Sequence, residues 1–379
     1  MPIYLDHAAT TRVLPEAAEA ALHAMTERFG NPSSRHALGL EAASALTEHR
    51  ATIAKALGDS DGQFLFTSGG TESNNWAISI MEQLGRRRGK HIITTAVEHS
   101  AVLEPMKRLE QQGYEVTYLE PDKYGRISSA QVEEVLRPDT IMVSMMLVNN
   151  ETGVLLPVAE VSTLLKAKRS AALLHTDAVQ GFLKVPFTPK ELGADFITIS
   201  AHKIGGPKGC GGLYVRKGHK TSPLLLGGGQ EQGLRSGTEG TALIAAFVAA
   251  AKIGMERQAT RRDYLLSLKK YALSALSSAL PELVVVSSGD APHICAISLP
   301  GYPSEMLVRD LSDRGIYVSS GSACHKGKPS HVFGAMKLSN RVSMGVLRIS
   351  FAEENTREDI DALTAALVSI SKERVPMKG

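Results

Sequence analysis

Residues 171–215 read AALLHTDAVQGFLKVPFTPKELGADFITISAHKIGGPKGCGGLYV, and this stretch decides the fold class of the chain. It contains three short apolar or β-branched runs, at 171–176, 195–200 and 211–215, separated by segments rich in glycine, proline and charge. Runs that are apolar almost throughout are typical of strands buried on both faces of a sheet. The stretch therefore predicts three strands of a buried sheet.

The same alternation continues upstream as far as residue 63, with helical periodicity between the apolar runs. Such a pattern is typical of a mostly parallel sheet covered by helices. Helices are also expected at 15–29, at 41–57 and after Pro157. The four further strand candidates are 63–68, 91–95, 115–120 and 140–146. We predict an α/β fold whose large domain is a mostly parallel seven-stranded sheet flanked by helices.

The pattern changes after about residue 256. We expect a helix from Asp263 that ends before Pro281, and a last helix that begins with a capping box formed by Thr356 and Asp359. The short strand candidates of this part are 283–286, 294–298 and 346–350. These elements indicate a smaller α+β domain, so that 15–256 forms the large domain, and 1–14 with 257–379 forms the small one.

Composition excludes several functional classes. The 42 Lys and Arg residues exceed the 39 Asp and Glu residues by only three among 379, too few for a nucleic-acid or membrane surface. No run of about 18 apolar residues exists, and the start MPIYLDHAATT is unlike an export signal. Three cysteines cannot all pair, and no Cys-x-x-Cys or His-Glu-x-x-His spacing indicates a metal site. We expect a cytoplasmic protein that binds neither membrane nor nucleic acid.

The first candidate for chemistry is Lys203, in the sequence SAHKIGGPKG directly after the 195–200 run. Loops at the carboxyl ends of strands are where open α/β sheets bind ligands. Ser200, His202 and the nearby glycines offer a hydroxyl, an imidazole and backbone N–H groups to an anion such as phosphate. A lone lysine is usually a surface residue, but this context favours a lysine that acts as a nucleophile toward an aldehyde.

Two further motifs agree with this interpretation. Asp177 and Gln180 follow the 171–176 run, where a carboxylate could keep a pyridine nitrogen protonated, as pyridoxal phosphate chemistry requires. Gly70 and Thr71 belong to a Gly-Gly turn before a helix, and unpaired N–H groups at a helix start bind anions. His99, just after the 91–95 run, could stack on an aromatic ring or transfer a proton.

Taken together, these motifs resemble one family. In order, the chain carries YLDHAATT, GNPSSRH, SGGTESNN, EHSA, VNNETG, HTDAVQ, SAHKIGGPKG, GGGQEQGLRSGTEG and SSGSAC. This series closely resembles the NifS/IscS-like cysteine desulfurases, enzymes of pyridoxal-phosphate fold type I related to class-V aminotransferases. The resemblance extends from residue 3 to about residue 351.

The resemblance implies a role for each matching residue. Lys203 matches the lysine that bonds to pyridoxal 5'-phosphate, and Asp177 and Gln180 match the partners of its ring nitrogen and phenolic oxygen. His99 matches the histidine that stacks over the ring and takes part in catalysis. The implied phosphate ligands are Gly70, Thr71, Ser200, His202 and Thr238, the last donated by the partner subunit of a homodimer.

The resemblance also implies how L-cysteine is bound and converted. Asn150 matches a residue near both cofactor and substrate, and Arg348 matches the arginine that binds the substrate carboxylate, a task that suits its fork of donors. Cys324 matches the thiol that accepts the sulfur as a persulfide and hands it to an acceptor protein. The implied reaction converts L-cysteine to L-alanine, for iron-sulfur cluster assembly or other sulfur-containing molecules.

Cys324 is the residue that separates the alternatives. Small residues and glycine flank it, as in a mobile loop, whereas Cys295 lies in an apolar run, and Cys210 is expected to be structural. An aminotransferase or a cysteine or selenocysteine lyase on the same fold would need Lys203 but not Cys324. A catalytically silent sulfur-relay or scaffold protein would need neither. The stretch from Cys324 reads CHKGKPSH, a shorter and more basic loop than the family pattern, so the acceptor stays open.

Overall fold

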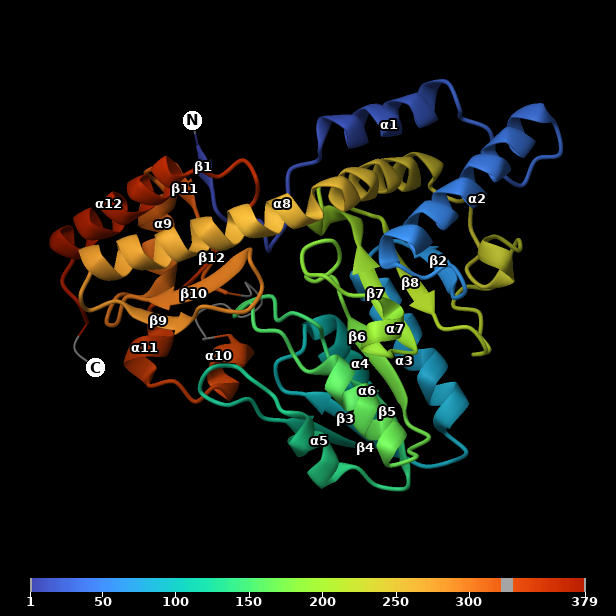
Figure 1. The fold of residues 1–379 in the computed structure, drawn as a ribbon, viewed down its shortest axis with the longest axis horizontal. Coiled ribbons are helices and arrows are strands. Elements are labelled where there is room, and N and C mark those ends of the chain that lie inside the picture. Colours follow the sequence, from blue (N-terminus) through green and yellow to red (C-terminus); the bar gives the residue numbers. More distant parts are fainter. Residues whose placement is uncertain (1, 322–329, 378–379) are drawn as a thin grey trace.

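The computed structural model describes residues 2–321 and 330–377. Its largest feature is a seven-stranded sheet with the strand order β2-β8-β7-β6-β5-β3-β4 (Figure 1). Strand β8 runs antiparallel to β2 and β7, and the other pairs are parallel. The strands are β2 (Gln63–Thr67), β3 (His91–Thr95), β4 (Glu115–Leu119), β5 (Thr140–Ser144), β6 (Leu173–Asp177), β7 (Phe196–Ser200) and β8 (Gly211–Val215). The predicted α/β class and mostly parallel sheet are confirmed.

Successive residues of each central strand enter different hydrophobic cores. Ile92 packs in the core that contains α3 and α4, whereas Ile93 packs in the core on the opposite face. Met142 and Val143 of β5 divide in the same way. Because side chains alternate along a strand, a run must be apolar at every position when both faces are covered. This is why the strands could be predicted as continuous apolar runs.

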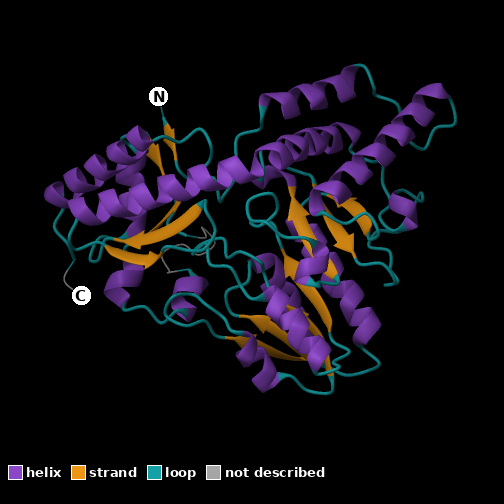
Figure 2. Ribbon diagram, viewed as in Figure 1, coloured by secondary structure: helices purple, strands orange, loops and turns teal. Residues whose placement is uncertain are grey.

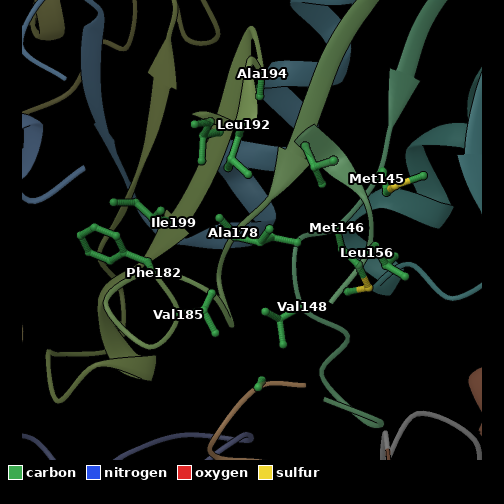
Figure 3. Packing of buried hydrophobic residues seen from close by; sticks show 14 of the residues in the cluster. Met145, Met146, Val148, Leu156, Ala178, Phe182, Val185, Leu192, Ala194 and Ile199 are labelled. Atoms are coloured by element: carbon green, nitrogen blue, oxygen red, sulfur yellow. The ribbon is translucent and has the colours of Figure 1, made fainter. Parts of the chain in front are cut away.

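Helices cover both faces of this sheet (Figure 2). Their bounds are α1 (Pro15–Thr26), α2 (Ala37–Leu57), α3 (Gly70–Gly85), α4 (Ser100–Gln111), α5 (Ser129–Val135), α6 (Val158–Ala167) and α7 (Pro189–Leu192). Figure 3 shows the core beneath the carboxyl edge of the sheet, where Met146, Val148, Ala178 and Phe182 pack together. Within the described ranges, no helix has the length and apolar character needed to cross a membrane.

A second, smaller sheet has the order β12-β10-β9 and is antiparallel throughout. Its strands are β9 (Val284–Ser287), β10 (Ile294–Ser298) and β12 (Val346–Ser350), and β1 (Ile3–Tyr4) pairs separately with β11 (Ile316–Tyr317). The helices here are α9 (Ser304–Ser312), α10 (His331–Ala335), α11 (Asn340–Met344) and α12 (Arg357–Glu373). The capping box of Thr356 and Asp359 forms as predicted.

One long helix, α8 (Thr241–Ala279), joins the two sheets. The expectation that a helix begins at Asp263 is wrong, because α8 starts 22 residues earlier. No proline interrupts this part of the chain, and its one internal glycine, Gly254, costs only about 1 kcal/mol relative to alanine. The first half of α8 packs in the core of the large sheet and the second half in the core of the small sheet, as Figure 1 shows. The division into domains after residue 256 stays a prediction.

Candidate active site

The parallel strands bring the predicted residues to one edge. Strands β3, β5, β6 and β7 are parallel, and β2 points the same way because both β2 and β7 are antiparallel to β8. Their carboxyl ends therefore lie along the same edge of the sheet. The segments that follow carry Gly70, His99, Asn150, Asp177 and Lys203. Open α/β sheets bind ligands at this edge.

A cavity of about 420 Å³ lies at this edge. Its volume is within the range of small-molecule sites. Ten residues predicted from the sequence line it: Gly70, Thr71, His99, Asn150, Asp177, Gln180, Ser200, His202, Lys203 and Arg348. The N-terminal segment adds Asp6, Ala8 and Ala9, and β12 contributes Arg348, so both sheets and the N-terminus form the cavity.

Lys203 ends a short 3-10 turn (Ala201–Lys203) that follows β7. Its Nζ donates hydrogen bonds to the carbonyl oxygens of Ala8 (2.6 Å) and Ala9 (2.7 Å). Burial, with a smaller contribution from the positive charge of Arg348, lowers the pKa of the Lys203 amine to about 8. A lysine with a pKa near 8 carries a useful fraction of nucleophilic neutral amine at neutral pH.

Asp177 is the last residue of β6 and is buried. Its Oδ2 accepts a hydrogen bond from Asn74 Nδ2 at 2.7 Å, and its Oδ1 accepts one from the Val179 backbone N–H at 2.9 Å. Each carboxylate oxygen has two lone pairs, so the group can still accept from a ring nitrogen in the cavity. Sequence reasoning missed Asn74, because its contact with Asp177 joins residues 103 positions apart.

The end of the cavity near α3 is suited to an anion. Gly69 has a φ of 150°, a value that favours glycine, and a Cβ at Gly70 would come within 2.9 Å of Val179. The N–H groups of the first turn of α3 therefore lie close to the carboxyl ends of β6 and β7. Ser200 Oγ is buried there and has no hydrogen-bond partner among the described residues. An anion at this position would satisfy both the hydroxyl and the helix start.

His202 and His99 border the same cavity from different elements. His202 Nδ1 lies 3.2 Å from Thr10 Oγ1, and burial, followed by the charge of Lys203, lowers the His202 pKa to about 4. Its imidazole is thus neutral at neutral pH. His99 Nδ1 accepts from the Ala101 N–H at 3.1 Å and caps α4. This bond leaves the proton on Nε2 of the neutral ring.

Arg348 is buried in β12 and holds two partners. Its Nη1 donates to the Asn150 carbonyl oxygen at 3.0 Å, and its Nη2 donates to Asp6 Oδ1 at 2.7 Å. Its Nε is buried without a partner among the described residues. Asp6, which sequence reasoning did not select, therefore sets the direction of the guanidinium group. The unused Nε–H can bind a further carboxylate oxygen.

Thr238 is the predicted residue that the structure describes outside this cavity. Thr238 is exposed and lines a neighbouring cavity with Ser68, Gly209 and Arg235. Cys324 lies outside the described residues. The other two cysteines, Cys210 and Cys295, are free and buried, as expected for structural residues.

The residues present fit pyridoxal 5'-phosphate. An amine of lowered pKa suits the aldehyde, a buried carboxylate suits the ring nitrogen, and a helix start with an unpartnered hydroxyl suits the phosphate. These three features lie on one cavity. Among these groups, Ser200 Oγ is a buried polar atom without a partner in the described part of the chain.

Comparisons with known proteins agree with this chemistry. The model of the aminotransferase class-V family matches residues 3–363. A "Cysteine desulfurase IscS" of Methanosarcina thermophila is 40% identical over 374 residues, which are 97% of this chain and 91% of that protein. The solved structure of a "NifS-like protein" is 36% identical, with a TM-score of 0.93 over 99% of this chain and 100% of that chain. Another, "SspA in complex with cysteine", is 32% identical, with a TM-score of 0.81 over 93% and 100%.

Proposed function

The chain belongs to the class-V aminotransferase family, and from this membership we propose how its cavity carries out cysteine desulfuration. The relatives at about 40% identity over nearly the full length are cysteine desulfurases, and the chain is a pyridoxal-phosphate-dependent cysteine desulfurase. The single observation that carries the proposed site is the cavity in which Lys203, Asp177 and Arg348 meet.

Each part of the cofactor would be held by different residues. Lys203 would bond to the aldehyde, Asp177 would pair with the ring nitrogen, and Gln180 would contact the phenolic oxygen. His99 would stack on the ring, while Asn150 would border both cofactor and substrate. The phosphate would be held by Gly70, Thr71, Ser200 and His202. When bound, pyridoxal 5'-phosphate supplies an electron sink for negative charge on the substrate carbon.

Arg348 positions the substrate. The carboxylate of L-cysteine would bind the guanidinium group of Arg348, a residue that lines the cavity and whose Nε has no partner among the described residues. Asp6 and the Asn150 carbonyl hold the other two nitrogens and keep the group in one orientation.

Lys203 moves the proton of the reaction. Lys203 Nζ would hold the aldehyde of the cofactor, and in its neutral form it is the group that would take the α-proton of the substrate and hold it for return. The Ala8 and Ala9 carbonyls, which accept from Nζ in the structure, hold the amine at this edge of the cavity. His99 is the second candidate for proton transfer, through Nε2.

Cys324 receives the sulfur. Its thiolate attacks the substrate sulfur, so that an S–S bond forms as the substrate C–S bond breaks. The electron pair of the broken bond goes to the substrate carbon, which is completed by a proton to give L-alanine. The persulfide on Cys324 then passes its outer sulfur to an acceptor, for iron-sulfur cluster assembly or another thiolation pathway.

Three finer statements belong to the same proposal. The enzyme acts as a homodimer in which Thr238 reaches the phosphate site of the partner. The sulfur acceptor is a separate protein, and neither a membrane nor a nucleic acid takes part. The protein is cytoplasmic.

The test uses purified holoenzyme with L-cysteine and a thiol reductant. We expect alanine and sulfide in equal amounts, and loss of both in Lys203→Ala and Cys324→Ser. Cys210→Ala is the matched control, because it removes a buried thiol away from the cavity lining and leaves the yields unchanged.

The alternatives predict other products. Sulfide from Cys324→Ser at the wild-type rate would indicate a lyase, and a keto acid in place of alanine would indicate an aminotransferase. A pure protein without a visible absorption band would indicate a silent scaffold protein. Any of these three results contradicts the proposal.

A further inference from the structure

Gln180 lies where three segments of the chain meet. Its Nε2 donates to the carbonyl oxygen of Ala8 at 2.8 Å. Its Oε1 accepts from Lys184 Nζ at 3.3 Å and lies 3.3 Å from His293 Nε2. Ala8 belongs to the N-terminal segment, Lys184 to the turn after β6, and His293 directly precedes β10 of the small sheet.

These contacts fix the direction of the amide. The Ala8 carbonyl can only accept, so the amide atom that faces it must be the nitrogen. The other amide atom is therefore the oxygen, and because an oxygen can only accept, Lys184 Nζ and His293 Nε2 must donate to it. Ala8 takes one of the two hydrogens of the –NH2 group. The other is available to a ligand in the cavity that Gln180 lines.

Lys184 and His293 have no place in the mechanism derived above. Both are buried, with 8% and 1% of their surface exposed. Burial lowers the pKa of the Lys184 amine and of the His293 imidazole well below their ordinary values, and neighbouring positive charges act in the same direction. A neutral amine and a neutral imidazole still donate hydrogen bonds, so the contacts to Gln180 Oε1 do not require charge.

The turn that carries Lys184 is held firmly in the core. Phe182 and Val185, which flank the pair Leu183 and Lys184 in the sequence, pack among the buried residues that Figure 3 shows. Leu183 between them has a φ of 56°, and its side chain fills the space beside Gly254 of α8. A Cβ at position 254 would lie 2.7 Å from Leu183 Cδ1. The position of the Lys184 amine is therefore set by packing against α8.

We propose that Lys184 and His293 are positioning residues that hold the Gln180 amide with its –NH2 group toward the cofactor cavity. The proposal rests on the proposed function, in which Gln180 contacts the phenolic oxygen of pyridoxal 5'-phosphate. A reversed amide would present a carbonyl oxygen to that oxygen and remove a favourable hydrogen bond. Because His293 comes from the small sheet, the direction of the amide depends on how the two sheets pack.

The test follows the visible absorption band of the holoenzyme against pH. The midpoint of this band reports how well hydrogen-bond donors stabilise the ionised phenolic oxygen. We expect Lys184→Met and His293→Phe each to raise the midpoint by about half a pH unit to one unit, the effect of weakening one hydrogen bond. The double variant raises the midpoint by more than the sum of the two single shifts, because the remaining donor in each single variant still holds Oε1 in part. His293→Gln, which keeps an N–H donor, stays near the wild-type midpoint.

The decisive comparison repeats Lys184→Met in a Gln180→Leu background. If Lys184 acts through the Gln180 amide, Lys184→Met causes no further shift of the midpoint in the Gln180→Leu background. An equal shift in both backgrounds would mean that Lys184 acts directly by charge or by folding, and would overturn the proposal. The apparent Kd of each apoprotein for pyridoxal 5'-phosphate gives the same comparison independently of the band, so a variant with a weak band still decides the question.

The contact of Gln180 with the cofactor and the positioning role of Lys184 and His293 are tested separately. If Gln180→Leu itself leaves the midpoint and the Kd unchanged, the assigned contact of Gln180 in the proposed function is wrong. Gln180→Leu could change the midpoint and the Kd while Lys184→Met and His293→Phe change neither quantity. In that case only the positioning role is wrong.

Discussion

At the scale of single residues, the most informative group is the Lys203 amine. Burial and the positive charge of Arg348 lower the pKa of this amine to about 8. Below that pH, the neutral fraction of the amine rises about tenfold per pH unit, and well above it nearly all of the amine is neutral. We predict a pH-dependent rate of covalent binding of pyridoxal 5'-phosphate to the apoprotein. The rate rises with pH and reaches a plateau near pH 8. Stopped-flow absorbance measures this rate.

Two variants serve as controls for the Lys203 prediction. Lys203→Ala gives no covalent adduct at any pH. Arg348→Met removes a positive charge that is one cause of the lowered Lys203 pKa. This variant therefore raises the pH at which the rate of covalent binding reaches its plateau. A wild-type rate that keeps rising to pH 10, as for an ordinary lysine, would show that the amine is not perturbed.

A second residue-scale prediction concerns Glu98, which is fully buried beneath the cavity. Its Oε1 accepts from the Met146 N–H at 2.7 Å, yet burial raises the Glu98 pKa to about 8. The folded state therefore keeps a proton that the unfolded chain releases above about pH 4.5, so stability falls as pH rises toward 8. Glu98→Gln removes this titration.

We expect the free energy of unfolding of wild-type apoprotein to decline relative to Glu98→Gln between pH 5 and 8, by at most roughly 1.4 kcal/mol per pH unit. Urea unfolding at several pH values measures the difference. Parallel pH profiles for the two proteins would mean that Glu98 is ionised in the folded state.

The residues also differ in how far the sequence could predict them. Lys203 and Asp177 each follow a recognisable strand, so their place at the carboxyl edge follows from a pattern within about 30 residues. Asp6 contacts Arg348 across 342 positions, and Asn74 contacts Asp177 across 103. Such contacts depend on how distant elements pack, and no local spacing carries that information.

At the scale of elements, the strands were predicted well and one helix was not. Each strand of the large sheet is an apolar run bounded by turn residues, which fixes its place within one or two positions. The first half of helix α8 packs in one core and the second half in another, so the buried side of the helix changes along its length. The periodic spacing of its apolar residues is therefore interrupted near residue 256. The start of this helix at Thr241 therefore could not be predicted from the pattern after residue 256.

The continuity of α8 gives an element-scale prediction. Glu256 is exposed in the middle of this helix, where a proline would remove a backbone hydrogen bond and clash with the preceding turn. We expect Glu256→Pro to lower the free energy of unfolding by about 3 kcal/mol or more, whereas Glu256→Ala leaves it nearly unchanged. Urea unfolding followed by circular dichroism measures both. A tolerated proline would mean that the helix is interrupted at the predicted boundary.

At the scale of the whole molecule, the proposed dimer makes a prediction for Thr238. Thr238 does not line the cavity that contains Lys203 of its own chain, although its neighbouring cavity shares Ser68 and Gly209 with the space beside Thr71 and Ser200. A contact of Thr238 within one chain and a contact across the proposed dimer have different consequences for activity. Mixed dimers of two defective chains distinguish them.

We predict that Lys203→Ala and Thr238→Ala chains, mixed under conditions that exchange subunits, regain desulfurase activity. In a mixed dimer, the Thr238→Ala chain keeps its own Lys203 and receives an intact Thr238 from its partner, so one of the two sites is complete. At full exchange of equal amounts, half of the dimers are mixed and each has one working site, so activity returns to about one quarter of wild type. If Thr238 serves its own chain, no complete site forms, and mixing adds nothing to the residual activity of Thr238→Ala dimers.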